Sequence, residues 1–174
     1  MHGLASPAST HEPAERLDKT VLDILIYLFE TYISGGMDAA PEPSRDSLKT
    51  ELSLAGFADR DIEDAFAWLE SLASLPATVH EPSSATRVFS AHESARLDIE
   101  CRGYLQHLEN LGILNATQRE WVIDRLLAVT REDIDIEEVK WVVLIVLFSQ
   151  PESANAYARM EDLVFAGQDD HAVH

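Results

Sequence analysis

Residues 135–148 read D-I-E-E-V-K-W-V-V-L-I-V-L-F, and this stretch decides the fold. Asp135 followed three residues later by Glu138 is a helix-start pattern, in which each side chain caps the backbone of the other. Residues 141–148 are then apolar without interruption. A helix that is apolar on every side must be covered on every side. We therefore expect a central helix around which other helices pack.

A buried strand is the alternative for this stretch, because periodicity alone does not separate a short apolar strand from a buried helix. The capping pair and the lack of matching strand partners favour the helix. As a helix, residues 141–148 would rise only about 12 Å, against about 30 Å for the hydrocarbon core of a membrane. We therefore expect no membrane span here.

The composition is that of a globular protein, with 174 residues, 46% of them apolar and 25% charged. This length suits one large domain or two small ones and needs no disulfide to hold a core. The chain has one cysteine, Cys101, which excludes an internal disulfide and fits a reducing compartment. With no secretory signal visible, we expect a cytoplasmic protein.

The net charge of −18 is the strongest compositional feature, and the excess of acids is shared evenly between residues 1–75 and 76–174. Nucleic-acid-binding proteins displace phosphate counterions with clustered Lys and Arg, and no such cluster is present in the sequence. The charge therefore argues against nucleic acid as a partner. It fits either simple solubility or an acidic surface made for a basic protein.

The chain divides near residues 76–92 into two predicted units. Residues 1–19 contain few large apolar groups, and we expect them to be a disordered extension. We expect residues 20–91 to form a winged-helix-like or helix-turn-helix-like unit, residues 92–167 a helical unit with the central buried helix, and residues 168–174 a tail. The predicted fold class is mainly all-α, with a three-helix unit packed against a four-helix unit.

In the first unit, apolar residues recur at helical spacing in three segments, residues 20–34, 44–55 and 59–75. Gly56 predicts a tight turn between the second and third helices, as in a helix-turn-helix. Residues 79–90 are the candidate for a short hairpin, with residues 87–89 as its clearest strand. Such a hairpin would complete a winged helix, although its β signal is weak.

In the second unit, two further capping pairs predict helix starts. Ser90 precedes Glu93 by three residues, and Thr117 precedes Glu120 by the same spacing. The predicted helices of this unit cover residues 90–111, 117–129, 135–148 and 154–166.

The sequence predicts no catalytic, cofactor-binding or metal-binding residues. Its seven histidines lack the spacing of a zinc site, and its glycines lack the pattern of a phosphate-binding loop. Cys101 falls on an apolar helical stripe, where cysteine behaves as a small hydrophobic residue. We therefore expect a non-enzymatic protein without a cofactor.

A polar stripe interrupts the apolar first helix, where Asp23, Tyr27 and Glu30 share one face. If that face is covered, its carboxylates need cationic partners, because a buried unpaired charge is costly. The candidate cations are Arg102, Arg125 and Lys140. The stripe thus predicts structural ion pairing of Asp23 and Glu30 with Arg102 and Lys140; a solvent-facing strip and a docking site are the alternatives.

The start of the third helix is the candidate partner-binding surface, and the residues that we expect to contact a protein partner are Arg60, Asp61, Asp64 and Trp68. This segment is rich in acids and would be repelled by a phosphate groove. The plainer interpretation is that the acids face water and favour the positive end of the helix dipole.

Two other functional hypotheses stay open. A nucleic-acid-associated winged-helix protein would need a positive patch, for which the candidates are Arg45, Lys49, Arg60 and Arg87. An unrecognised enzyme would need a deep polar pocket. A helix-turn-helix shape does not decide between these hypotheses, because function depends on the site.

Short motifs follow one another through residues 21–166. They are DILIYLFETY at 23–32, AGF at 55–57, DI at 61–62, WLE at 68–70, RLD at 96–98, CRG at 101–103, LE at 108–109, KWV at 140–142, VLF at 146–148 and NAY at 155–157. In this order they resemble the bacterial Smg family, a domain of unknown function. The departures are residues 1–20, the loop at 35–43 and the tail. The resemblance implies a small cytoplasmic protein with no assigned reaction, whose gene commonly lies beside one for a DNA-processing protein.

Overall fold

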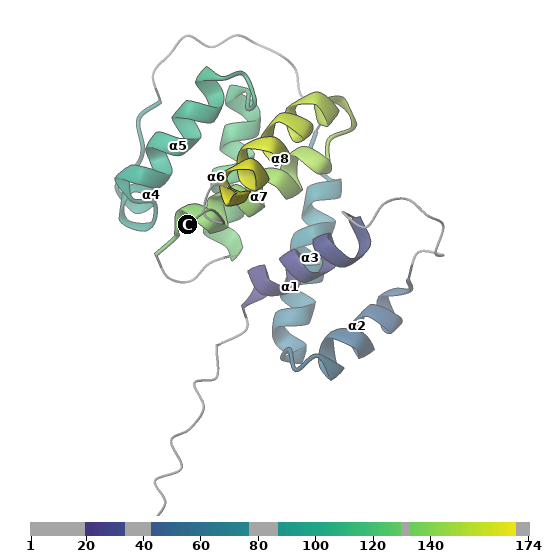
Figure 1. Cartoon of the computed structure of the whole chain (residues 1–174). Coiled ribbons are helices and arrows are strands. Elements are labelled where there is room, and N and C mark those ends of the chain that lie inside the picture. Colours follow the sequence, from purple (N-terminus) through teal and green to yellow (C-terminus); the bar gives the residue numbers. More distant parts are fainter. Residues whose placement is uncertain (1–19, 34–42, 77–86, 130–132, 170–174) are drawn as a thin grey trace, which may run out of the picture.

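The computed structural model describes residues 20–33, 43–76, 87–129 and 133–169, which are mostly helical (Figure 1). The first unit contains α1 (Val21–Leu28), its continuation as a π-helical turn η1 (Phe29–Ile33), α2 (Arg45–Leu54) and α3 (Asp59–Ala73). The second contains α4 (Ala91–Arg96), α5 (Ile99–Asn110), α6 (Ala116–Val129), α7 (Ile136–Phe148), a short 3-10 turn η2 (Pro151–Ser153) and α8 (Ala154–Asp169). The predicted all-α class is confirmed.

The central helix is α7, and it starts as the sequence predicts. The Asp135 carboxylate accepts a hydrogen bond from the Glu138 backbone N–H, and the Glu138 carboxylate accepts one from the Asp135 N–H, both at 2.9 Å. Residues 142–147 are all buried. Helices α5, α6 and α8 pack along α7, which explains why its apolar surface needs no polar face.

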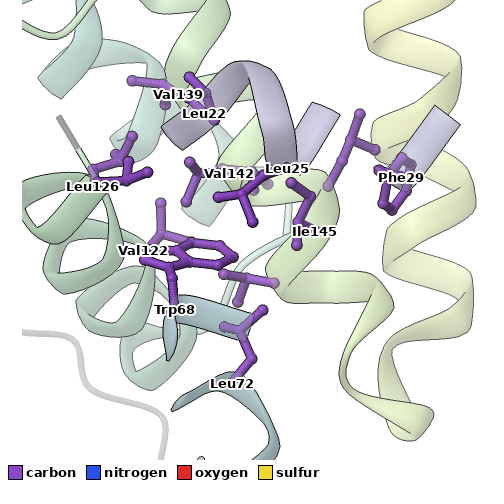
Figure 2. Packing of buried hydrophobic residues seen from close by; sticks show 14 of the residues in the cluster. Leu22, Leu25, Phe29, Trp68, Leu72, Val122, Leu126, Val139, Val142 and Ile145 are labelled. Carbon is purple, nitrogen blue, oxygen red and sulfur yellow. The ribbon is translucent and has the colours of Figure 1, made fainter. Parts of the chain in front are cut away.

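The hydrophobic core is continuous between the two units. Figure 2 shows Leu22 of α1 beside Val139 of α7 and Leu25 beside Val142, with the ring of Trp68 from α3 against Val122 of α6. The predicted boundary near residues 76–92 therefore separates two groups of helices along the chain, but both groups contribute side chains to one core.

The turn between α2 and α3 has the geometry that the sequence predicts. The Ser44 hydroxyl caps α2 by accepting a hydrogen bond from the Ser47 N–H at 3.2 Å. Gly56 has a φ of +91°, a left-handed conformation that favours glycine. The Phe57 N–H then donates to the Leu52 carbonyl at 3.1 Å and closes the turn.

No wing is present in the part of the chain that the structure describes. Residues 77–86 lie outside it, and residues 87–90 are not a strand. The prediction of a strand at residues 87–89 is wrong, because Arg87 is held by Glu93 and Glu120 at 2.6 and 2.7 Å and lies over the ring of Phe89. Side-chain contacts, rather than a backbone ladder, fix this segment.

The single helix predicted over residues 90–111 is also wrong, because the chain breaks between α4 and α5. Leu97 is fully buried, has an extended backbone and forms an isolated parallel bridge with Ile134, next to the start of α7. Asp98 then caps α5 by accepting a hydrogen bond from the Cys101 N–H at 2.8 Å. The capping box of Ser90 and Glu93 does start α4, as predicted.

The predicted cap of Thr117 and Glu120 is wrong by two residues. The reciprocal pair at the start of α6 is Asn115 and Gln118, with hydrogen bonds of 2.8 and 3.0 Å. Glu120 turns instead to Arg87. The expected extension, residues 1–19, and residues 170–174 of the expected tail lie outside the described residues.

Candidate functional site

The start of α3 places three of the four predicted contact residues on the outside. The Arg60 side chain is 76% exposed, and its guanidinium lies 4.0 Å from the carboxylate of Asp64, one turn further on. Asp61 is half-buried. Trp68 lies on the same helix but is only 5% exposed, and its indole N–H donates to the Arg125 carbonyl at 3.1 Å. Trp68 is therefore a core residue, which corrects its assignment as a contact residue.

Helices α2 and α3 are joined by a network of exposed charges. The guanidinium of Arg45 donates to Glu63 at 2.8 Å and to Glu70 at 2.5 Å, and it lies 5.0 Å from the ring centre of Phe66. Lys49 donates to Glu63 at 2.7 Å. Hydrogen bonds from Lys49 and Arg45 hold the pKa of Glu63 below its ordinary value. Exposed pairs of this kind contribute little stability and are screened by salt.

The four cations expected to form a positive patch all lie beside carboxylates. Arg45 and Lys49 contact acids of α3, and Arg60 contacts Asp64. Arg87 is 13% exposed and contacts Glu93 and Glu120 of the second unit. The geometry does not gather these cations into one exposed patch.

A shallow hollow lies on the outer face of α2, with a volume of about 460 Å³. Its lining residues are Asp46, Lys49, Thr50, Ser53 and Leu54. Leu54 is 85% exposed. Leu54 is not among the contact residues predicted above. Leu48 and Leu52 lie on the inner face of the same helix, and the position of Leu54 off that face is a usable signal.

The polar stripe of α1 faces largely outward. Asp23 and Glu30 are exposed, and the Asp23 carboxylate accepts a hydrogen bond from the Thr20 backbone N–H at 2.6 Å. Lys140 donates to Glu137 at 2.6 Å, and Arg102 donates to the backbone carbonyl of Asp98 at 3.2 Å. These contacts take the place of the ion pairs predicted for Asp23, Lys140 and Arg102. For Asp23 and Glu30, the alternative of a solvent-facing strip fits the structure better than a covered face does.

The third member of the stripe, Tyr27, helps to tie α1 and η1 to α2. The hydroxyls of Tyr27 and Tyr32 both donate to the carboxylate of Glu51, at 2.6 and 2.5 Å. These two hydrogen bonds lower the pKa of Glu51, and the bond to Glu51 raises the pKa of Tyr32 to about 12. The arrangement fixes the orientation of α2, the helix that carries the hollow.

The thiol of Cys101 lies in unreactive surroundings. Cys101 is buried with its Sγ 3.4 Å from the Ile134 carbonyl, and burial, with the neighbouring Asp98, raises the pKa of its thiol to about 12. A thiol with a raised pKa is a poor nucleophile at neutral pH. Within the described ranges, no three or more His, Cys, Asp or Glu side chains come together as metal ligands.

None of the helices in the described part of the chain has the length and apolar character needed to cross a membrane. The fold and the sequence define a class of small, acidic proteins that are mainly α-helical. The chain belongs to the family described as "Protein of unknown function (DUF494)", whose model matches residues 21–174. The resemblance drawn from the sequence motifs is thereby confirmed.

Relatives named "Protein Smg homolog" align over most of the chain. The protein of Methylococcus capsulatus is 50% identical over 149 residues, which cover 86% of this chain and 95% of the relative. That of Alkalilimnicola ehrlichii is 47% identical over 161 residues, covering 91% and 98%. That of Nitrosococcus oceani is 45% identical over 153 residues, covering 86% and 95%. No solved structure matches the chain.

Proposed function

We propose that this protein is a non-enzymatic, cytoplasmic interaction protein whose acidic α2–α3 surface binds a basic face of another protein. The α2–α3 surface is defined here by Asp46 and Leu54 of α2 and by Arg60, Asp61 and Asp64 of α3. The observation that carries the proposal is the pairing of this region's cations with its own carboxylates, which leaves acids in excess on an exposed face.

The excess can be followed along α2 and α3. Residues 45–73 contain the bases Arg45, Lys49 and Arg60, and the acids Asp46, Glu51, Asp59, Asp61, Glu63, Asp64 and Glu70. A surface with one predominant sign of charge speeds encounter with an oppositely charged partner and rejects partners of like charge. Leu54, exposed beside the hollow, adds an apolar contact that electrostatic steering alone does not supply.

The nucleic-acid-associated alternative needs cations that can meet phosphate groups. Arg45, Lys49, Arg60 and Arg87 each lie within ion-pairing distance of a carboxylate, so they would have to give up that partner first. The negative charge of the whole chain opposes such an approach as well. The protein-binding proposal requires neither the loss of these ion pairs nor an approach against like charge.

The test is affinity capture from a native lysate with the Asp61→Lys, Asp64→Lys double variant beside the unchanged protein. A matched control reverses two exposed acids elsewhere, Glu100→Lys and Asp162→Lys, and so changes the net charge equally. We expect the α3 variant to lose its partner and the control to keep it, with both retaining the helical circular dichroism signal. Equal capture by all three proteins would overturn the assignment, and so would equal loss from both variants.

A gel-shift assay at low salt addresses the alternative directly. We expect no shift of duplex or single-stranded DNA at micromolar protein, because low salt strengthens electrostatic repulsion as much as attraction. A shift that disappears on neutralising Arg45 and Lys49 would favour nucleic acid over a protein partner.

A further inference from the structure

Five aromatic rings form a connected group where η1, α7 and α8 meet, and none of them belongs to α2 or α3. We call this group the aromatic face; its members are Phe29, Trp141, Phe148, Tyr157 and Phe165. Phe29 lies in its centre, with ring centroids 6.1 Å from Trp141, 5.6 Å from Phe148 and 6.3 Å from Tyr157. Phe148 and Tyr157 are 5.6 Å apart, and Trp141 and Phe165 are 6.4 Å apart.

The aromatic face is only partly used by the core. Phe29 is 3% exposed, and Figure 2 shows it beside the ribbon of α8. Phe148 and Phe165, at the two ends of the group, are 47% and 40% exposed. Trp141 and Tyr157 are half-buried. A single exposed apolar residue is ordinary, but a group of partly exposed aromatic rings is typical of binding surfaces.

The backbone at this place is unusual as well. The first helix continues past Leu28 as the π-helical turn η1, and Phe29 is the first residue of that turn. A π-helical turn is a rare backbone conformation that is frequent at functional sites. It lies here against the same rings that reach the surface.

Carboxylates border the aromatic face. Glu161 lies one helical turn from both Tyr157 and Phe165, and after burial its negative charge is a further cause of the raised pKa of Tyr157. Glu30 follows Phe29 in the chain and is exposed. Glu137 stands one turn before Trp141, where it engages the neighbouring Lys140 at 2.6 Å. Lys140 thus already has a carboxylate partner, and Glu161 and Glu30 bring further negative charge to this border.

We propose that the aromatic face binds an amphipathic, basic segment of a partner protein, with the partner's apolar side chains on the rings and its Lys or Arg side chains on the bordering acids. A basic segment satisfies both features at once. A second copy of this chain would bring its own acids against these acids, and an anionic membrane surface or nucleic acid would be repelled in the same way.

The probe is a fluorescein-labelled synthetic peptide with Leu and Lys placed so that a helix has one apolar and one basic face. A peptide of the same composition in scrambled order has the same charge but no apolar face. At about 0.15 M salt, where long-range attraction is screened, we expect fluorescence anisotropy to report at least about tenfold tighter binding of the amphipathic peptide. Equal affinity for both peptides would mean that charge alone drives binding, which would overturn the proposal.

Two variants separate the aromatic face from the rest of the surface. Phe148→Ser with Phe165→Ser removes the exposed rings, and we expect it to weaken binding of the amphipathic peptide by at least about tenfold. The matched control, Val88→Ser with Ile99→Ser, removes two exposed apolar residues from other places, at 86% and 81% exposure, and should leave binding unchanged. Unchanged binding by the phenylalanine variant would overturn the proposal.

Two further measurements distinguish the proposed occupant from a second copy of the chain, and binding at the aromatic face from binding at the α2–α3 surface. The Asp61→Lys, Asp64→Lys variant should keep the preference for the amphipathic over the scrambled peptide, because that preference comes from the rings, so failure at one surface leaves the other testable. Sedimentation equilibrium of the free protein should show a monomer. A dimer that disappears in the Phe148→Ser, Phe165→Ser variant would assign the aromatic face to a second copy and overturn the proposed occupant.

Discussion

Arg87 is the side chain through which the segment before α4 is held to the second unit. Its guanidinium donates to Glu120 at 2.7 and 2.8 Å and to Glu93 at 3.0 and 2.6 Å. Because Arg87 donates to it, the pKa of Glu93 falls from 4.5 to about 2, and the pKa of Glu120 is lowered for the same reason. Charge-assisted bonds of this kind, largely shielded from water, stabilise more than exposed pairs do.

The Arg87→Gln variant should lower the free energy of unfolding by about 2 kcal/mol at neutral pH, because it removes the charged donor of Glu93 and leaves Glu120 with Arg119 alone. The pKa of Glu93 is depressed in the folded state, so the stabilisation is present above its unfolded pKa near 4.5 and is lost as the pH falls towards 2. Urea unfolding of both proteins between pH 7 and pH 2 should therefore show the two stabilities converging at the acid end.

Arg60→Gln is the matched control, since the pair of Arg60 and Asp64 is highly exposed and its atoms are 4.0 Å apart. We expect no measurable change in urea midpoint from this variant at any pH, as is common for surface pairs. An Arg87→Gln difference that stayed constant down to pH 2 would mean that packing against Phe89, rather than charge, is what this side chain provides.

Trp68 is the residue whose predicted role, a contact with a partner, differs most from its position in the structure, which is in the core. Trp68→Ala should destabilise the fold by about 3–5 kcal/mol, because it removes a large buried ring between α3 and α6. Trp68→Phe retains most of the ring, and we expect the loss to be smaller, about 1 kcal/mol for the missing hydrogen bond to Arg125. Urea unfolding measures both. A Trp68→Ala protein with unchanged stability and a lost partner would restore the original surface assignment.

At the scale of the elements, helix starts decide where the chain turns. Asp98 begins α5 directly after the extended Leu97, and its carboxylate accepts the Cys101 N–H at 2.8 Å. The hydrogen bond from the Cys101 N–H lowers the pKa of this carboxyl, so the cap is charged at neutral pH. Without it, the first turn of α5 has an unsatisfied backbone donor beside a buried residue.

Replacing Asp98 by Ala should lower the melting temperature by about 3 °C, the usual effect of losing an N-cap in a chain of this length. Asp98→Asn keeps a side-chain acceptor and should retain most of the stability. Differential scanning calorimetry distinguishes the two variants. If Asp98→Ala melted with the unchanged protein, the bridge between Leu97 and Ile134 would be sufficient to hold the break between α4 and α5.

The elements also show what local sequence can and cannot predict. The capping box of Asp135 and Glu138 is local and unambiguous, and α7 follows from it. Near α6, two overlapping capping patterns lie two residues apart, and the choice of Asn115 depends on Gln118 reaching Ser153 far along the chain, at 2.7 Å. The break at Leu97 depends on Ile134 in the same way. Where a distant partner decides, spacing alone fails.

The candidate surfaces follow the same division. The exposure of Arg60 and Asp64 agrees with their polar character at the start of α3, a local property. The burial of Trp68 depends on α6, and the aromatic face depends on three elements that meet only in the folded chain. Helical periodicity places residues on a face of one helix, but it does not say which other helix, if any, covers that face.

At the scale of the whole molecule, two features act against each other. A net charge of −18 repels itself within a compact fold, and both proposed surfaces keep acids exposed. A continuous core opposes this repulsion. In it, apolar side chains of α1 and α3 pack against those of α6 and α7 (Figure 2). The acidic exterior is therefore sustained by packing that neither unit has alone.

Separating the units tests that dependence. A fragment of residues 87–174 lacks Leu22, Leu25, Trp68 and Leu72, which are all buried in the shared core. Large buried side chains are worth about 2–5 kcal/mol each, so their joint loss is comparable with a total stability of about 5–15 kcal/mol.

We expect the fragment to bind a hydrophobic dye and to melt without a cooperative transition. We expect the full chain to unfold in one step by circular dichroism and tryptophan fluorescence. Mixing in a fragment of residues 1–86 should restore cooperative unfolding, because it returns the missing side chains to the core. A residues 87–174 fragment that folded cooperatively alone and bound no dye would show instead that the second unit is an independent domain.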